Sequence, residues 1–475
     1  MDSQKITILK FSIYLIVIFL IASVTITVSD ATERPPNIIL IMADDMGYER
    51  VGAYGGISSK TPALDTLAAQ GMRFEYAYSQ PMCTPSRVKI MTGLFNFRNY
   101  VGWSKLQPGE ATFARYLREQ GYRTLLAGKW QLNSDGGQYP WDAENGFDEV
   151  ITKRGSSSYE GDPYWGHPMV IHRDGKKTNI NDEQAFIPDL CATFTRDFIK
   201  RNARAQQPFF AYRPMYLPHS PEVCTPDQGS GPDDCSLSNQ ERYTAMVEYL
   251  DKEIHLLLNE LDQLGIRENT LVLFTSDNGA IGRLSSELAD GTIIQGGKGR
   301  TTDAGTRVPF IASWPGTIPT NRTNPNPIDF SVVLPTMLHA AIAPQLSAAT
   351  MQEQLQRFDG PSILDQLRGE AGHPRGWAYV YYEPKRPQNP DIFAEFVRDE
   401  RYKLYRDGKF FDIQEDPFEK DAISENESSF EASTVRARLQ GILDQIHTCE
   451  EVCKYDCRER ACAVLDTPPV RVRDR

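Results

Sequence analysis

Two short apolar runs that end in polar, mostly acidic residues constrain the fold of this chain more than any other feature of its sequence. The run NIILIMA starts at Asn37 and the run TLVLFTS starts at Thr270, and each is followed at once by a pair of acidic or amide residues. A continuous apolar run of this length is typical of a strand buried on both faces, as strands in parallel sheets are. The sequence therefore predicts a sheet with other elements packed on both of its faces.

Helical patterns alternate with these strands along the chain. Helices are predicted over residues 61–71, 112–120 and 238–265, and further strands at YRTLLAG and PFFAYRP. Such alternation predicts an α/β fold with a large, mainly parallel sheet that is covered by helices on both faces. The segments 135–189 and 341–358 are weakly patterned, and no element is predicted there.

The pattern changes near Pro374. Four short aromatic segments, WAYVYYE, FAEFVRD, RYKLYRD and KFFDI, are joined by turn residues, and a helix is predicted over about 433–447. We therefore divide the chain into a signal peptide or signal anchor at 1–30, a main domain at 35–373, and a region at 374–475. This last region is predicted to be a smaller α+β subdomain with a short antiparallel sheet and a cysteine-rich tail.

The N-terminal segment predicts export. It contains the apolar run FSIYLIVIFLIASV and, after it, small and polar residues near Ser29 and Ala31 that suit a signal peptidase. The apolar stretch from Phe11 to Val28 also approaches the length of a membrane span, so an uncleaved anchor is the less favoured alternative. The mature chain is thus expected to be secreted, periplasmic or lysosomal.

Exported chains fold in oxidising surroundings, so most of the eight cysteines are expected to form disulfides. Cys224 and Cys235 flank a loop rich in Gly, Pro and Asp, and a disulfide between them is expected to close it. Triplets at Asn321 and Asn426 match the acceptor pattern for glycans. Four more cysteines crowd the C-terminus, and there disulfides are favoured over a zinc site: Cys449, Cys453, Cys457 and Cys462.

The formal net charge of −12 gives no electrostatic basis for nucleic-acid binding, which needs a basic surface. Any site for an anion must instead be built locally from a few cations. Ligands in open α/β sheets bind beyond the carboxyl ends of the strands. Lys129 follows the predicted strand RTLLAG and His219 follows PFFAYRPMYLP, whereas Lys298 lies in the glycine-rich segment QGGKGRT.

Oxygen-bearing side chains follow the two apolar runs: Asp44, Asp45, Asp277 and Asn278. Each alone has an ordinary explanation as a turn or cap residue. Together they offer the oxygen ligands that suit calcium or magnesium and not zinc. Without an ion, acids this close would repel one another and some would stay protonated.

The stretch PMCTPSRVKIMTG places Cys83 beside the start of a predicted helix, because Pro85 suits a first helical turn. A thiol at the positive end of a helix would be acidified and reactive. Three alternatives stay open from the residues alone. They are a disulfide with Cys191, an inert buried thiol, and a protease-type nucleophile supported by His219 and Asn278.

In full, PMCTPSRVKIMTG resembles the sulfatase signature, in which Cys-x-Pro-Ser-Arg directs the conversion of cysteine to formylglycine (3-oxoalanine) by a formylglycine-generating enzyme. The resemblance continues, in the family's order, through ADDMG, GYRTLLAGKW, PHSP, TSDNG and GGKGRTTDAGTRVP, and reaches RYKLYRDGKFFDIQEDPFEKD near the C-terminus. It covers about residues 36–422. It implies an alkaline-phosphatase-like fold and hydrolysis of aryl or carbohydrate sulfate esters.

The resemblance also implies roles for individual residues. Arg87 would support the formylglycine, Lys129 and Lys298 would hold sulfate oxygens, and His219 would protonate the leaving alcohol. A calcium ion, or a magnesium ion, would be held by five residues: Asp44, Asp45, the modified Cys83, Asp277 and Asn278.

One position departs from the family pattern. Gln131 stands where the family usually has a histidine, and glutamine can donate a hydrogen bond but cannot take a proton near neutral pH. Slower release of the sulfated intermediate is therefore predicted, or a base supplied by another group. A binding protein without activity is one alternative function. A phosphodiester or phosphonate hydrolase on the same fold is another.

Two loops, 155–178 and 224–235, are expected to shape the substrate pocket, because they lie near the strand ends that carry the motifs. The first is rich in aromatic and histidine side chains. These either stack on a sugar or aryl group or serve ordinary loop packing: Tyr159, Tyr164, Trp165, His167 and His172.

Overall fold

The two apolar runs form neighbouring parallel strands in the computed structural model. Strand β1 (Asn37–Ala43) pairs with β9 (Thr270–Ser276), and Ala43 lies opposite Ser276. Every residue of both strands is buried, as the sequence predicted. The described residues are 34–133, 139–153, 164–343, 345–386 and 392–456.

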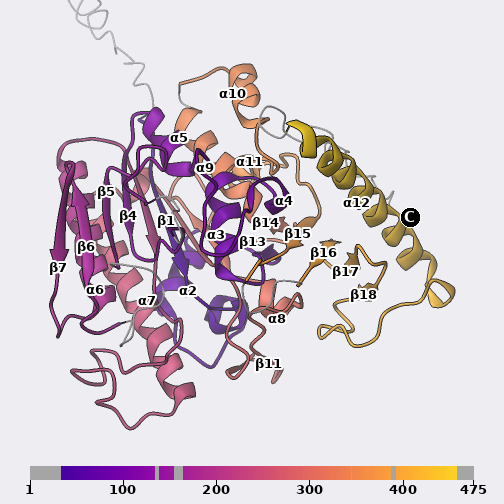
Figure 1. The fold of residues 1–475 in the computed structure, drawn as a ribbon, viewed down its shortest axis with the longest axis horizontal. Coiled ribbons are helices and arrows are strands. Elements are labelled where there is room, and N and C mark those ends of the chain that lie inside the picture. The colour runs from indigo at the N-terminus through magenta and orange to yellow at the C-terminus, as the bar shows by residue number, and fades with distance from the viewer. Residues whose placement is uncertain (1–33, 134–138, 154–163, 344, 387–391, 457–475) are drawn as a thin grey trace, which may run out of the picture. The chain divides into compact units, whose positions relative to one another are not determined.

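Among these described residues, ten strands form the main sheet (Figure 1). The five strands from β9 to β5 run parallel, and β12, β6 and β7 join them in antiparallel pairs. The predicted large, mainly parallel sheet is thus confirmed. In order across the sheet, the strands are β13 (Arg322–Asn324), β2 (Met72–Phe74), β12 (Phe310–Ser313), β9, β1, β8 (Phe209–Pro214), β4 (Arg123–Ala127), β5 (Glu149–Lys153), β6 (Met169–Arg173) and β7 (Lys176–Ile180).

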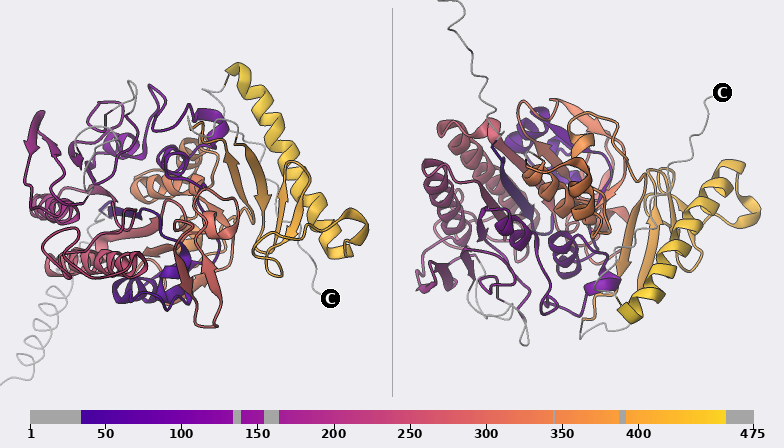
Figure 2. Two further views of the ribbon diagram at one scale, coloured as in Figure 1. Left: turned by 60° about the horizontal axis from the view of Figure 1, so that its bottom comes forward. Right: turned by 90° about the horizontal axis from the view of Figure 1, so that it is seen from above.

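Helices cover both faces of this sheet (Figure 2). Alternate side chains of β1 point to opposite faces, so Ile39 and Ile41 contact one core while Ile38 and Leu40 contact the other. The first core is closed by α2 (Pro62–Ala69), α6 (Ile187–Arg204) and α7 (Asn239–Gln263). The second is closed by α3 (Cys83–Thr92), α5 (Phe113–Glu119), α9 (Val333–Ile342) and α11 (Leu364–Leu367).

Short elements connect these layers. Two small sheets are formed by β3 (Ala77–Tyr78) with β14 (Ile328–Asp329) and by β10 (Ser285–Glu287) with β11 (Ile293–Gln295). Further helices are α4 (Asn96–Asn99), α8 (Asp303–Thr306) and α10 (Ala348–Leu355).

The four aromatic segments after Pro374 form a separate antiparallel sheet, as predicted. Its strands are β15 (Ala378–Tyr382), β16 (Ala394–Arg398), β17 (Tyr402–Tyr405) and β18 (Phe410–Asp412). The helix packed on it, α12 (Phe430–Asp456), is longer than predicted and places Leu439 and Leu443 in the core of this sheet. The division of the chain between residues 373 and 374 stays a prediction.

The weakly patterned segment 135–189 contains three strands that the sequence did not reveal. These are β5, β6 and β7, and α6 begins at Ile187. The sequence KKTNI of β7 is mostly exposed because it forms the edge of the sheet. An edge strand without a buried face lacks the alternation by which strands are recognised.

The cysteines divide into bonded and free residues. The predicted disulfide between Cys224 and Cys235 is present, and Cys83 and Cys191 are both free and buried, so a disulfide between those two is wrong. The predicted signal peptide or anchor and Cys457 and Cys462 lie outside the described residues, as do the side chains of Cys449 and Cys453. Of the residues that are described, none belongs to a helix long and apolar enough to cross a membrane.

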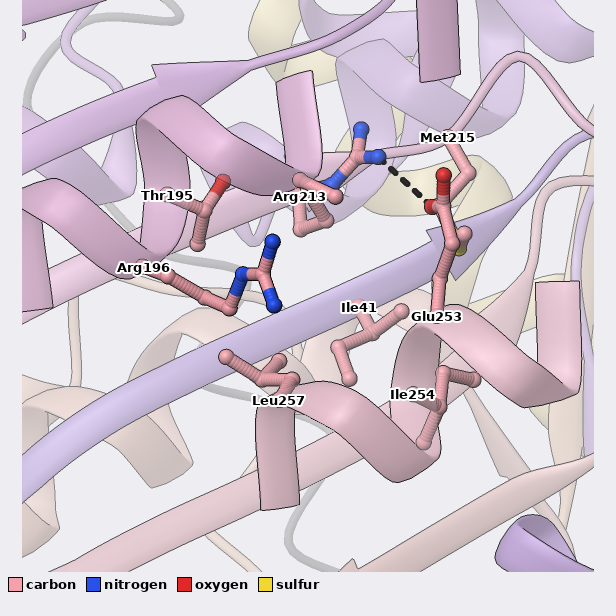
Figure 3. Close-up of a pocket in the computed structure, with 9 residues that line it drawn as sticks. Ile41, Thr195, Arg196, Arg213, Met215, Glu253, Ile254 and Leu257 are labelled. Atoms are coloured by element: carbon pink, nitrogen blue, oxygen red, sulfur yellow. Dashed lines mark hydrogen bonds and ion pairs between the residues drawn. The ribbon is translucent and has the colours of Figure 1, made fainter. Parts of the chain in front are cut away.

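A pocket between the sheet and one helical layer is lined by apolar side chains and by Thr195, Arg196, Arg213 and Glu253 (Figure 3). Its main polar feature is a buried ion pair, in which Arg213 Nη2 lies 2.8 Å from Glu253 Oε2. The same guanidinium donates to the carbonyl oxygens of Ala127 at 2.9 Å and Pro188 at 3.0 Å. Arg213 therefore joins β8 to β4, α6 and α7.

Candidate active site

The in-register pairing of β1 and β9 brings the four residues that follow them into contact. The backbone N–H of Asp45 donates to Asp277 Oδ1 at 3.1 Å, and Asn278 Nδ2 donates to Asp45 Oδ1 at 2.7 Å. Asp44 lies beside them, and all four side chains are buried. The sequence prediction that these residues meet at one edge of the sheet is therefore correct.

Two lysines approach this acidic group. Lys129 Nζ lies 2.5 Å from Asp44 Oδ2, and Lys298 Nζ lies 2.5 Å from Asp45 Oδ2. Lys129 follows β4 and Lys298 follows β11, so segments distant in sequence supply the two ammonium groups. Their positive charges face the same centre from two directions.

Glycines allow the backbone near each lysine to approach its neighbours. A Cβ atom on Gly128, whose φ is 139°, would lie 1.8 Å from the carbonyl oxygen of Pro214. A Cβ on Gly297 would lie 2.6 Å from the backbone of Ala304. The glycines of AGKW and QGGKG are therefore required by close contacts at these positions, and not only by turns.

Arg87 is the buried cation of the site. Its Nη2 lies 2.7 Å from Asp277 Oδ2 and 3.7 Å from Asp44 Oδ1, and its Nη1 donates to the carbonyl oxygen of Lys129 at 3.0 Å. Arg87 thus fixes the orientation of Asp277 and ties α3 to the end of β4.

His219 lies at the partly exposed side of the site. Its Nε2 is 3.6 Å from Asp45 Oδ2, and its Nδ1 is 2.5 Å from the carbonyl oxygen of Ser220. The hydroxyl of Tyr164 donates to the carbonyl oxygen of His219. The second ring nitrogen, Nε2, is consequently the one that faces the acidic group.

Cys83 is the first residue of α3, and its thiol is buried. Gln131 Nε2 donates to Cys83 Sγ at 3.1 Å, while no described contact joins His219 to Cys83. Within the described residues, the arrangement of a cysteine protease, with histidine on the thiol, is therefore not formed.

The sulfatase family model matches residues 36–343 of this chain. The chain is also 31% identical over 414 residues to "Arylsulfatase A" of Homo sapiens, which covers 79% of this chain and 75% of that protein. The chain belongs to the sulfatase family. Members of this family are sulfuric ester hydrolases.

Two further similarities place this sulfatase among known proteins. It is 34% identical over 324 residues to "N-acetylgalactosamine-6-sulfatase" of Canis lupus familiaris, which covers 61% of this chain and 59% of that relative. A solved structure of a protein in complex with its substrate D-glucosamine-2-N,6-O-disulfate aligns with a TM-score of 0.67 and 20% identity. The alignment covers 90% of this chain and 100% of that one, and at this identity it supports the fold alone.

The site of this sulfatase fits a hard divalent cation. The oxygens Asp44 Oδ1 and Asn278 Oδ1 are buried and have no hydrogen-bond partner, which is costly unless an ion takes them. Ligand atoms of Asp44, Asp45 and His219 all lie within 4.8 Å of one another. Asp277 differs from the prediction in one respect, since its carboxylate already accepts bonds from Arg87 and from the backbone of Asp45.

The charges of the site shift the pKa values of its acids in opposite directions. Burial alone would raise the pKa of Asp44 and Asp45, but the adjacent lysines hold both below their usual range. Burial, and next the charge of Asp44, raise the pKa of Asp277 to about 7 despite Arg87. Without an ion, Asp277 is thus the acid of this group that first takes up a proton as the pH falls, in line with the expected repulsion.

Calcium binding is therefore expected to tighten as the pH rises through about 7. The ion must displace the proton that Asp277 carries below its pKa of about 7. The apparent affinity should change by up to about tenfold per pH unit below that value and level off above it. Calorimetric titration of chelator-treated protein with CaCl2 across this range checks the slope. The Asp277→Asn variant should show a smaller slope, and an affinity independent of pH in the unaltered protein would contradict the assignment.

One tyrosine of the site was not found from the sequence, and a second, Tyr164, was expected to stack on a substrate or pack in a loop and instead supports a backbone carbonyl. Tyr243 on α7 donates its hydroxyl to the carbonyl oxygen of Asp45 at 2.6 Å, and Tyr164 supports His219 as described. Tyr243 precedes Met246 by three positions and so shares the buried stripe of its helix. That spacing predicts burial, but it contains no signal for the partner of the hydroxyl.

Three other candidate pocket residues make contacts within the protein or are buried, and their role toward a substrate stays a prediction. Trp165 Nε1 donates to the carbonyl oxygen of Cys224 at 3.0 Å, and the ring of His172 stacks on Trp141 with centroids 5.8 Å apart. His167 is buried. Tyr159 lies outside the described residues.

Proposed function

We propose that the chain hydrolyses sulfate esters of a carbohydrate or aryl alcohol, using a formylglycine made from Cys83 and a bound calcium or magnesium ion. The observation that carries this proposal is the position of a free cysteine at the start of α3, beside three basic residues that contact a cluster of buried acids. A disulfide at Cys83 would exclude this chemistry, and none is formed. The names of two relatives, "Arylsulfatase A" and "N-acetylgalactosamine-6-sulfatase", support sulfate esters as the substrate class.

The formylglycine would supply the nucleophile, and the divalent ion would supply part of the charge stabilisation. A formylglycine contributes a hydrated aldehyde whose hydroxyl attacks sulfur, and a divalent ion lowers the cost of placing an anion there. The ion would be held by Asp44, Asp45, Asp277, Asn278 and the modified Cys83.

The remaining roles belong to side chains of the site. Lys129 and Lys298 each contact a carboxylate that an ion would share, so their ammonium groups would turn toward sulfate oxygens. Arg87 holds Asp277 in place and lies on the helix of Cys83, so it supports the modified residue by position.

His219 would donate the proton to the leaving alcohol through Nε2, since Nδ1 is directed to a backbone carbonyl. Loss of hydration lowers the pKa of His219 to about 4, although Asp45 and Asp44 partly oppose this shift. An anionic substrate adds a negative charge beside the ring and so raises that pKa. The imidazole would therefore gain its proton together with the substrate.

A comparison of two chromogenic esters tests this proposal. The protein should hydrolyse 4-nitrophenyl sulfate much faster than bis(4-nitrophenyl) phosphate. The reverse preference would favour a phosphodiester hydrolase on the same fold. Lack of activity toward sulfate esters in protein whose formylglycine is intact would favour a binding protein that retains the anion pocket.

The substitution Gln131→His is expected to raise the turnover number. Gln131 contacts Cys83 but cannot take a proton, and its buried Oε1 has no hydrogen-bond partner. General-base help is worth ~10²–10⁴ in rate, which sets the upper limit of the gain. The backbone of Gln131 has φ 63°, a conformation that histidine tolerates better than most residues.

Steady-state kinetics of the Gln131→His and Gln131→Asn variants check this expectation. The asparagine variant keeps an amide and adds no base, so it should not gain activity. Unchanged turnover in the histidine variant would show that this position does not limit the reaction.

Export and maturation complete the proposal. The Cys224–Cys235 disulfide supports folding in an oxidising compartment, in keeping with secretion directed by the N-terminal segment. A formylglycine-generating enzyme would be the partner during maturation. Glycans would attach at Asn321 and Asn426, both of which are exposed.

A further inference from the structure

A second group of side chains borders Cys83 and takes no part in the roles described above. Arg386 follows β15 of the C-terminal sheet, and its guanidinium carbon lies 4.5 Å from the ring centroid of Trp103. We call these two residues the Trp103–Arg386 pair. They come from parts of the chain that are nearly three hundred positions apart.

The segment that carries Trp103 lies against the start of α3. The backbone N–H of Ser104 faces Thr84 Oγ1 at 3.4 Å, and Thr84 directly follows Cys83. On its other side, Lys105 forms a bridge with Asn133, two residues after Gln131. The segment that follows Trp103 is therefore held against both the helix of Cys83 and the loop of Gln131.

The end of β15 is fixed to the same place. Tyr382 packs in one apolar cluster with Met82, the residue before Cys83, and Trp103 packs against that cluster. The hydroxyl of Tyr100 donates to the carbonyl oxygen of Pro384 at 2.8 Å. The backbone on both sides of the pair is thus anchored next to the reactive residue.

The guanidinium of Arg386 has an unused donor. Its Nε is buried and has no hydrogen-bond partner, and no ion pair with a described carboxylate involves this side chain. The nearby carboxylate of Glu383 is taken by Lys385, at 3.3 Å, and by the hydroxyl of Tyr381, at 3.4 Å. A buried guanidinium N–H without an acceptor is unfavourable unless a ligand supplies one.

We propose that the Trp103–Arg386 pair binds a second anionic group, a carboxylate or another sulfate, on the alcohol part of the substrate. The planar fork of arginine suits both anions, because each offers two oxygens in one plane. This inference rests on the proposed function and narrows its substrate class. The preferred substrate is a sulfate ester whose alcohol has a further negative charge close to the scissile bond.

The test compares substrates that differ in the second anion alone. One couple is 2-carboxy-4-nitrophenyl sulfate with 4-nitrophenyl sulfate, and the other is D-glucosamine-2-N,6-O-disulfate with D-glucosamine 6-O-sulfate. The Arg386→Gln change should lower kcat/KM for the doubly anionic member of a couple by on the order of ten- to a hundredfold more than for the other member. This loss should come mainly from a higher KM. The first couple reports on a carboxylate and the second on a sulfate.

Two variants control for folding and for charge. Arg386→Lys keeps the positive charge but lacks the planar pair of guanidinium donors. It should retain part of the preference for the doubly anionic substrate. Arg357 is also stacked on an aromatic ring, with its guanidinium carbon 5.7 Å from the centroid of Tyr116, and Arg357→Gln should leave the preference unchanged. Thermal unfolding of each variant shows whether it is folded.

Binding to a protein that cannot turn over separates this inference from the proposed function. The Cys83→Ala variant should bind the disulfated glucosamine more tightly than the monosulfated one, and the additional Arg386→Gln change should remove the difference. An equal effect of Arg386→Gln on both members of each couple would rule out the second anion site at the Trp103–Arg386 pair. It would leave the proposed sulfate ester hydrolysis unaffected. Failure of the unaltered protein to cleave 4-nitrophenyl sulfate would instead count against the proposed function.

Discussion

Replacing Cys83 by alanine is expected to abolish sulfate ester hydrolysis, with a loss on the order of 10⁶-fold in kcat, as when other enzymes lose their nucleophile. Cys83 is free, lies at the first residue of α3 and contacts Gln131. The fold should survive, because one small buried side chain is shortened. Initial rates on 4-nitrophenyl sulfate and thermal unfolding of the same preparation check both statements.

Cys191 provides the matched control. It is the other free, buried cysteine of the described residues and lies on α6, in the core on the opposite face of the sheet from α3. Cys191→Ala should therefore keep nearly full activity. Equal losses in both variants, or substantial residual turnover in Cys83→Ala, would contradict the assignment of Cys83 as the source of the nucleophile.

The Cys83→Ser variant sharpens this result. A serine side chain has one hydroxyl, whereas a hydrated aldehyde has two hydroxyls on the same carbon. It could therefore release at most about one equivalent of alcohol per protein before turnover stops. Repeated turnover at the rate of the unaltered protein would show that the modification is not needed.

Replacing Arg87 by glutamine is expected to have the second largest effect, on stability as well as on activity. Arg87 and Asp277 form an ion pair at 2.7 Å, and the side chains of both are 0% exposed. At a pH above the pKa of Asp277, removal of Arg87 leaves a buried carboxylate uncompensated, which typically costs about 3–5 kcal/mol. Denaturant unfolding should show this loss, and added CaCl2 should recover part of it by supplying a positive charge.

Arg115 is the control for this substitution. It forms an ion pair at 3.1 Å with Glu119, and the two side chains are 39% and 53% exposed. Exposed pairs on one helix contribute only a few tenths of a kcal/mol, so Arg115→Gln should hardly change the free energy of unfolding. A similar small change for Arg87→Gln would mean that Arg87 is not essential to the charge balance of the site.

The central strands of the fold could be predicted because each one is marked by a run of apolar residues within its own segment. NIILIMA and TLVLFTS are mostly apolar, and their pairing as β1 and β9 agrees with strands that are buried on both faces. The exposed edge strand β7 has no such pattern, and β12 and β13 join the sheet only through contacts with distant segments. Pairings of that kind depend on tertiary structure and not on local preference.

The candidate site could be predicted as a set of residues but not as a set of contacts. Strand ends and motifs indicate Asp44, Lys129 and Asp277, and the structure brings them together. No local pattern shows that Asp277 faces Arg87 or that Tyr243 reaches the backbone of Asp45. Those choices arise from how helices α3 and α7 pack on opposite faces of the sheet.

The chemical state of residue 83 decides whether the chain uses a formylglycine. The chain should be produced with a formylglycine-generating enzyme, and the peptide that contains Cys83 should be examined by mass spectrometry. Active protein is predicted to contain an aldehyde side chain there, and its activity should follow the fraction of Cys83 that is converted. Full activity in protein whose Cys83 is an unmodified thiol, or is joined in a disulfide, would contradict it.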